Sequence, residues 1–179
     1  ETRTYEIIED VKNFRSEIGV LFLNSYNRDV LTKMFDDNRL TYTSLFKARP
    51  HIFVSKSNPL AKHEVVSLED LEDFPYLSYD QGIHNSFYYS EEILSQIPHK
   101  KSIVVSDRAT LFNLLIGLDG YTIATGILNS NLNGDNIVSI PLDIDDEIDI
   151  VYLKHEKATL SKMGEKFLDN LVKEVTFDN

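Results

Sequence analysis

Two kinds of apolar pattern alternate along this chain. Short apolar runs predict strands, and apolar residues spaced three or four positions apart predict amphipathic helices. The expected strands are residues 18–23, 40–46, 51–54, 76–79, 102–105, 121–125, 137–140 and 148–153. The expected helices are residues 4–14, 27–35, 86–97, 107–118 and 161–175. This alternation indicates an α/β fold.

Capping residues place the helix boundaries. The expected N-caps are Thr4, Asn85 or Ser86, Ser106 or Asp107, and Thr159 or Ser161. Ser67 and Asp70 have the spacing of a capping box, which predicts a further short helix. Gly120 is expected to end the fourth helix, and Gly126 to begin another helical turn. The expected apolar faces are Leu111, Leu114, Leu115 and Leu118 in the fourth helix, and Leu160, Met163, Phe167, Leu168, Leu171, Val172 and Val175 in the last.

Residues 18–23 are apolar at every position. An unbroken apolar strand is typical of a parallel sheet that is covered on both faces. Pro50 separates the extended segments 40–46 and 51–54, which are candidates for a connection between two lobes. The pattern therefore predicts parallel α/β packing, in one domain or in two small lobes.

The chain has a net charge of −11 and no cysteine. Its Lys and Arg residues are scattered, so no cationic face is available to neutralise nucleic-acid phosphates. The lack of cysteine excludes a thiol nucleophile and cysteine-ligated zinc, and favours a reducing compartment. The most apolar stretch, residues 111–118, is too short to cross a bilayer. We expect a cytoplasmic protein that binds neither DNA nor membranes through these residues.

Motifs for metals and catalysis are incomplete. Two loops resemble calcium-binding sequences, but Ile148 and Lys154 replace the required glycine and glutamate after Asp143, and Ile140 closes the loop that begins at Asn129. The five histidines show no paired helical spacing, and neither a nucleophile elbow nor a phosphate-binding glycine-rich loop occurs. We expect no metal, no cofactor and no catalytic residue.

Polar residues follow several apolar strands at points where helices are expected to begin. In open α/β sheets such positions bind ligands, because helix N-termini present unpaired N–H groups. The candidate segments are residues 24–25, 79–86, 106–107 and 125–126. Each residue alone has an equally good explanation as a cap or turn. Their recurrence along the chain favours a ligand site.

These landmarks, in this order, resemble the effector-binding domain of LysR-type transcription regulators. Residues 7–23, IIEDVKNFRSEIGVLFL, resemble a helix and the strand entry of that family. Residues 51–61, HIFVSKSNPLA, are similar to the family's strand ending in HPLA, with Asn58 in place of the histidine. Residues 67–77 and 111–125 are similar to later passages of the same family. The resemblance spans essentially the whole chain.

The resemblance implies two Rossmann-like lobes of the type-2 periplasmic-binding-protein kind, joined by crossing strands, with an effector between them. The lobes would be residues 1–49 with 141–179, and residues 50–140. It implies effector contacts from Phe22, Asn24, Asp80, Gln81, Gly82, Ser106 and Thr125, to which the pattern of polar strand ends adds Ser86.

The family's domain normally begins with a strand, a helix and a second strand before the position of Glu1, so the first lobe is expected to be incomplete. The effector would be a small anionic or zwitterionic metabolite, and LSYDQG and GYTIATG resemble regulators of sulfur and amino-acid metabolism. DNA would be bound only by an absent N-terminal helix-turn-helix domain. Exposed apolar surface makes self-association an expectation.

Two other classes share this fold. One is a solute-binding protein of a transporter, which would carry an export signal. The other is an enzyme for amino-acid-like substrates, which would need an acid–base pair, and Asp80 and Asp107 are the nearby carboxylates.

Overall fold

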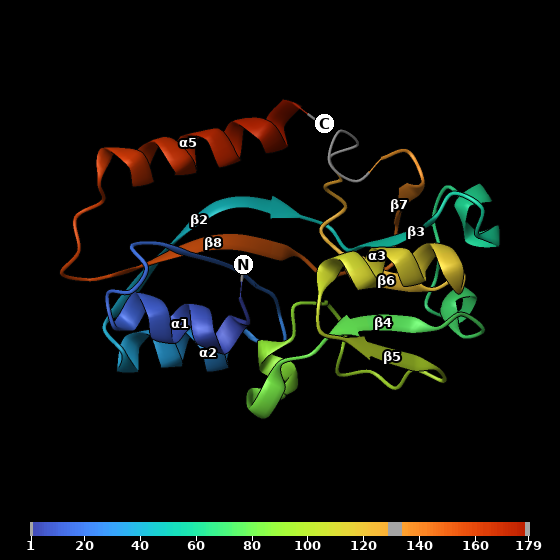
Figure 1. Cartoon of the computed structure of the whole chain (residues 1–179), viewed down its shortest axis with the longest axis horizontal. Coiled ribbons are helices and arrows are strands. Elements are labelled where there is room, and N and C mark those ends of the chain that lie inside the picture. Colours follow the sequence, from blue (N-terminus) through green and yellow to red (C-terminus); the bar gives the residue numbers. More distant parts are fainter. Residues whose placement is uncertain (1, 129–133, 178–179) are drawn as a thin grey trace. The chain divides into compact units, whose positions relative to one another are not determined.

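The computed structural model describes residues 2–128 and 134–177 (Figure 1). Its α-helices are α1 (Thr4–Lys12), α2 (Arg28–Asp37), α3 (Arg108–Gly117) and α5 (Lys162–Phe177). Its strands are β1 (Gly19–Leu23), β2 (Leu40–Ala48), β3 (His51–Ser55), β4 (Tyr76–Tyr79), β5 (Ser102–Val105), β6 (Tyr121–Ala124), β7 (Ile137–Pro141) and β8 (Ile148–His155). Short 3-10 helices lie at Pro59–Lys62, Glu69–Leu71, Gly82–His84 and Phe87–Tyr89. The predicted α/β class is confirmed.

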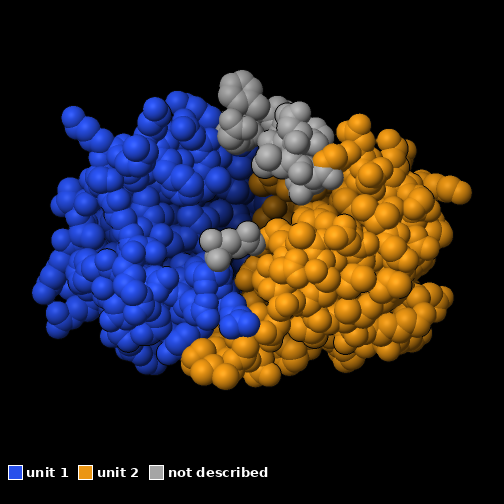
Figure 2. Space-filling model, viewed as in Figure 1, with its two compact units in different colours: residues 1–48, 147–179 blue, residues 49–146 orange. Residues whose placement is uncertain are grey.

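The chain forms two compact units, which Figure 2 shows in different colours. Unit 1 consists of residues 1–48 and 147–179, and unit 2 of residues 49–146. Each unit has a sheet of its own, so each can be described by itself.

Unit 1 is built on a sheet with the strand order β1-β8-β2, in which both pairings are antiparallel. Helix α1 packs against β1 and β8, and α2 packs against β2. Figure 1 shows α5 on the opposite side of this sheet. The buried core includes Ile8, Leu23, Leu31, Phe35, Val151 and Leu153.

Strand β1 does not lie in a parallel sheet, so that prediction is wrong. It runs antiparallel to β8, with Gly19 opposite Leu153 and Leu23 opposite Asp149. Leu21 and Leu23 are buried, whereas Val20 is half-buried. The unbroken apolar run reflects coverage of both faces, which an antiparallel strand can have as well.

Unit 2 contains a mixed sheet with the strand order β5-β4-β6-β3-β7. Strand β4 is parallel to β5 and β6, whereas β3 is antiparallel to β6 and β7. Helix α3 packs against β3, β4, β5 and β7. The core between them consists of Phe53, Leu77, Val105, Leu111, Leu115 and Ile137. Strands β4 and β5 have the bounds predicted from their short apolar runs.

Residues 86–97 do not form the predicted helix. The turn Phe87–Tyr89 is followed by irregular turns. Leu94 has a φ of 61°, a left-handed conformation that interrupts an α-helix. The adjacent Glu92 and Ile93 are both buried. Their burial against the sheet, rather than helical periodicity, determines the course of this segment.

Helix α3 begins as predicted after Asp107, whose Oδ1 accepts a hydrogen bond from the Thr110 N–H at 2.8 Å. It ends at Gly117 instead of Gly120, and Leu118 is 48% exposed. Leu118 was predicted to lie on the buried face, but it lies beyond the last helical turn. The buried face of α3 is therefore shorter than the sequence pattern.

Helix α5 begins after Ser161, whose Oγ accepts a hydrogen bond from the Gly164 N–H at 3.1 Å. Leu168 is buried, but Met163 is 76% exposed and Phe167 is 51% exposed. The predicted apolar face of this helix is therefore buried only in part.

Two local predictions at other positions are corrected. Thr4 is the first residue of α1 and not its cap, because the extended Arg3 precedes it and the Thr4 side chain is buried. Gly126 begins no helix within residues 126–128. Three predicted features fall outside the described residues. They are the helical turn after residue 128, the start of the polar loop at Asn129, and Asn133 of the predicted turn.

The capping box at Ser67 is present. Ser67 N–H donates to Asp70 Oδ2 at 2.8 Å, and Ser67 Oγ accepts from the Asp70 N–H at 3.3 Å. We expect Ser67→Ala to lower the free energy of unfolding by about 1 kcal/mol, because the first turn loses a hydrogen-bond acceptor. Urea denaturation measures this change. Ser106→Ala, which removes an exposed hydroxyl beside a different cap, is the control, and an equal loss in both variants would refute the capping role.

Candidate functional site

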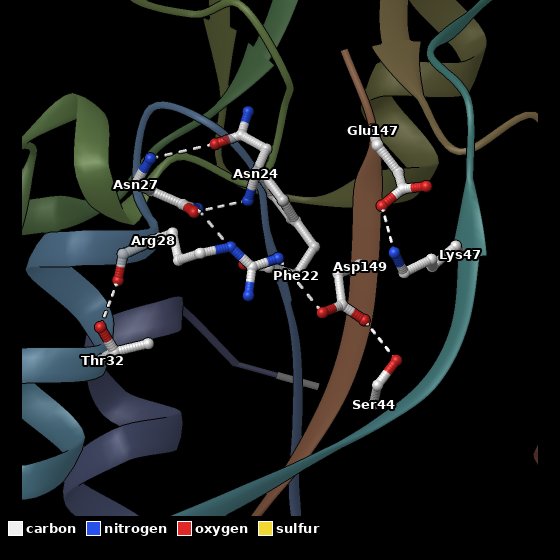
Figure 3. A network of polar contacts seen from close by, with 9 residues as sticks. All are labelled: Phe22, Asn24, Asn27, Arg28, Thr32, Ser44, Lys47, Glu147 and Asp149. Atoms are coloured by element: carbon white, nitrogen blue, oxygen red, sulfur yellow. Dashed lines mark hydrogen bonds and ion pairs between the residues drawn. The ribbon is translucent and has the colours of Figure 1, made fainter.

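The end of β1 and the turn that follows it in unit 1 contain two of the predicted site residues, Phe22 in the strand and Asn24 in the turn. Asn24 Oδ1 accepts hydrogen bonds from the backbone N–H groups of Tyr26 and Asn27, at 3.1 and 3.0 Å. Asn27 Oδ1 accepts from the Asn24 N–H at 2.9 Å, and its Nδ2 donates to the Phe22 carbonyl at 3.2 Å (Figure 3). The two buried asparagines therefore fix the end of this strand.

A charged network continues from this turn across the sheet (Figure 3). Arg28 Nη2 lies 3.2 Å from Asp149 Oδ2, and Ser44 Oγ donates to Asp149 Oδ1 at 2.5 Å. Asp149 is 6% exposed, and its two carboxylate oxygens contact a guanidinium and a hydroxyl, as a buried polar group requires. Lys47 and Glu147 form a second, exposed pair at 2.6 Å, which raises the pKa of Lys47.

The end of β4 in unit 2 holds three more predicted residues. Asp80 N–H donates to the Val105 carbonyl at 2.8 Å, and Asp80 Oδ1 accepts from the Gly82 N–H at 2.9 Å. Gly82 has a φ of 63°, which a residue without a side chain adopts at little cost. Gln81 is buried, and its Nε2 donates to Glu91 Oε1 at 3.3 Å. The tight turn thus places a carboxamide next to a carboxylate.

Arg108, the first residue of α3, lies beside the same strand end. Its Nη2 is 3.2 Å from Glu91 Oε2, and its guanidinium carbon is 5.6 Å from the centre of the Tyr79 ring. The two oxygens of Glu91 therefore contact Arg108 and Gln81 separately. Guanidinium groups bind carboxylates through paired hydrogen bonds, so an anionic ligand can compete with Glu91 for Arg108.

A cavity of about 420 Å³ lies in unit 2 next to β4 and β5. Its lining residues are Tyr76, Ser78, Tyr79, Asp80, Gln81, Asn85, Ser86, Phe87, Ser90, Ser95, Ile97, His99, Ser102 and Val104. The His99 ring stacks on Tyr76 with centroids 3.7 Å apart, and its Nδ1 lies 2.9 Å from Tyr121 Oη. Burial lowers the pKa of His99, which favours the neutral ring. The cavity is of ordinary size for a small-molecule site.

The structure brings together only part of the predicted set. Asp80, Gln81 and Ser86 line the cavity, and Gly82 belongs to the same turn. Ser106 is exposed and precedes the helix cap.

Thr125 does not line this cavity either. Its Oγ1 accepts from the Ile127 N–H at 3.4 Å, beside a Gly126 that has a φ of 83°.

Sequence reasoning missed the charged residues of both regions. Arg28 and Asp149 in unit 1, and Glu91 and Arg108 in unit 2, form ion pairs. An aspartate inside the apolar run of β8 was a usable signal. No signal in the sequence indicated the pairing of Glu91 with Arg108, because only the tertiary structure brings these two side chains together.

Within the described residues, no three His, Asp or Glu side chains are placed to share a metal ion. None of the described helices is both long and apolar enough to span a membrane.

The model of the LysR substrate binding domain family matches residues 1–176 of this chain. No curated protein matches it.

Solved structures share the fold. The PA01 protein, a LysR family transcriptional regulator from Pseudomonas aeruginosa, is 16% identical, with a TM-score of 0.62 over 96% of this chain and 57% of that protein. The effector binding domain of QuiR in complex with shikimate is 19% identical, with a TM-score of 0.64 over 96% of this chain and 77% of that one. The effector binding domain of BenM with its effector benzoate is 19% identical, with a TM-score of 0.63 over 98% and 76%.

Proposed function

This chain belongs to the LysR substrate-binding domain family, and from that premise we propose that it is the effector-sensing part of a bacterial transcription regulator. The family match over residues 1–176 carries the proposal. The chain spans 57% of the Pseudomonas regulator, and we propose that DNA is bound by a helix-turn-helix domain outside these residues. The net charge of −11 supports this, because a strongly acidic chain does not attract DNA phosphates.

We propose a small anionic or zwitterionic metabolite as the effector. QuiR and BenM were solved with shikimate and benzoate, and both of these ligands are carboxylates. In unit 2, Arg108 supplies a guanidinium, Gln81 a carboxamide and Asp80 a carboxylate at one strand end. A ligand carboxylate would pair with Arg108, and an ammonium group would favour the Asp80 side.

Further parts of the proposal concern the intact regulator. We propose an amino-acid or sulfur metabolite as the effector, self-association through exposed apolar side chains, and a cytoplasmic location. Effector binding would shift the population of assembly states and so change DNA binding.

The family match favours this function over a transporter's solute-binding protein or an enzyme. The carboxylates considered for acid–base chemistry already accept hydrogen bonds from neighbouring residues. Asp80 Oδ1 accepts from the Gly82 N–H, and both oxygens of Asp107 accept from Thr110. The hydrogen bonds from Thr110 lower the pKa of Asp107, which opposes a role as a general acid.

A thermal-shift screen of this chain tests the proposal. The compounds are amino acids, their O-acetyl derivatives, shikimate, benzoate, other small organic acids and sulfate. A ligand at a hundred times its Kd should stabilise the fold by about 2.7 kcal/mol. A screen in which nothing raises the melting temperature would contradict this ligand class.

The role of Arg108 is tested with any compound that binds. We expect Arg108→Ala to weaken binding about tenfold or more, because a carboxylate loses its charged partner. The matched control is Arg15→Ala, which removes an exposed ion pair with Asp10 in unit 1. Titration calorimetry gives both affinities, and equal affinities in the two variants would exclude Arg108 from the site.

A further inference from the structure

Strands β4 and β6 are neighbours in the sheet of unit 2, yet they separate after a single register pair. That pair is Tyr76 opposite Tyr121, whereas β4 pairs with β5 along its whole length. Beyond it, Tyr79 N–H donates to Glu92 Oε1 at 3.1 Å, and Ile93 N–H donates to the Ile123 carbonyl at 3.4 Å. Residues 91–93, called here the wedge segment, thus take the place of strand pairing at the end of β4.

The wedge segment is buried where it enters the sheet. Glu92 is 6% exposed and Ile93 is 2% exposed. Among the described residues, no partner reaches Glu92 Oε2 or the Tyr76 hydroxyl, and both atoms are buried. Buried polar atoms in folded proteins are almost always hydrogen-bonded. A buried carboxyl group in which one oxygen accepts a hydrogen bond and the other has no partner in the described part of the chain is therefore unusual.

The two carboxyl groups of the wedge segment, those of Glu91 and Glu92, contact different parts of the candidate site. Glu92 binds the backbone of Tyr79, whose ring lies beneath Arg108. Glu91 binds the side chains of Gln81 and Arg108. A movement of residues 91–93 would therefore disturb Tyr79, Gln81 and Arg108, two of which we assign to the effector.

We propose that Glu92 is a positioning residue for the effector site, and that loss of the proton from its carboxyl loosens the end of β4. That this strand end binds the effector rests on the proposed function. The positioning itself rests on the hydrogen bond to Tyr79 and on the burial of Glu92 between two strands.

The groups around Glu92 offer little to balance a negative charge. Tyr76 and Tyr121 approach from β4 and β6, and burial raises the pKa of both hydroxyls, so they stay neutral. Glu91 adds a like charge, and Arg108 is already paired with Glu91. Burial raises the pKa of Glu92 to about 7, against the opposing hydrogen bond from Tyr79 N–H.

Hydrogen–deuterium exchange of peptides that span residues 76–82 and 91–97 tests the proposal without any ligand. After correction for intrinsic exchange rates, the opening equilibrium of the wild-type chain should rise about tenfold from pH 6 to pH 8, because the open state favours the ionised carboxyl. The variant Glu92→Gln keeps an oxygen for Tyr79 and cannot ionise, so this rise should be absent from it.

The control is Glu72→Gln, which alters an exposed carboxylate paired with Lys100 and should behave as the wild type does. The pH series of the wild type remains informative if Glu92→Gln fails to fold. Flat wild-type exchange, or an equal rise in Glu92→Gln, would overturn the proposal. Because no effector is added, a failed ligand screen cannot produce either result.

Discussion

Replacing Leu115 with alanine is expected to lower the free energy of unfolding by about 3–4 kcal/mol. The side chain is fully buried in α3 and packs in the core of unit 2 with Leu77 and Val105. Removal of its outer carbons forfeits their burial and leaves a cavity that a sheet and a helix cannot close completely. Urea denaturation followed by circular dichroism measures the loss.

Leu118→Ala is the matched control, since the same substitution is made at the end of the same helix. Leu118 is 48% exposed, so its loss should be below about 1 kcal/mol. Similar losses at the two positions would mean that Leu118 is buried, as the sequence pattern predicted, and does not lie beyond the end of α3.

The apolar pattern predicts best the features that depend on local sequence. Residues 76–79 and 102–105 have the predicted bounds, because each is a short apolar run between polar loops. The reciprocal hydrogen bonds of Ser67 and Asp70 also followed from local spacing. Such features depend on neighbours within a few positions, which the sequence displays directly.

Features that depend on distant partners were not predictable. The direction of β1 is set by β8, which follows it by more than a hundred positions. The segment 86–97 has helical spacing, but Glu92 and Ile93 enter a sheet made by other strands. In both cases tertiary contacts override the local preference.

In the candidate site too, local sequence predicted some residues and missed those that depend on tertiary contacts. Asp80, Gln81 and Ser86 were predicted from their place after an apolar strand, and they line one cavity. Whether they bind an effector stays a prediction. Glu91 and Arg108 were missed, because charged residues at these positions look like ordinary solvated surface until the fold joins them.

The pH dependence of stability should reveal Glu92 in the global unfolding equilibrium as well. Burial raises its pKa from the ordinary value of 4.5 to about 7 in the folded state. A group with a raised folded pKa contributes its full stability below pH 4.5 and loses it as the pH rises through 7. Each pKa unit corresponds to about 1.4 kcal/mol, so the wild-type chain should lose about 3 kcal/mol between pH 4.5 and pH 8 from this group.

Other groups also titrate, and the variant Glu92→Gln separates their contributions from that of Glu92. Hydrogen bonds lower the pKa of Glu9 and Asp70, which adds stability as the pH rises toward their ordinary pKa values of 4.5 and 3.8. His99, whose pKa is lowered by burial, adds stability as the pH rises through 6.5. Both chains share these contributions, so the difference between their urea denaturation curves at each pH isolates Glu92. The variant should gain on the wild type by about 3 kcal/mol from pH 4.5 to pH 8, and a constant difference would show that this carboxyl ionises as freely in the folded state as in water.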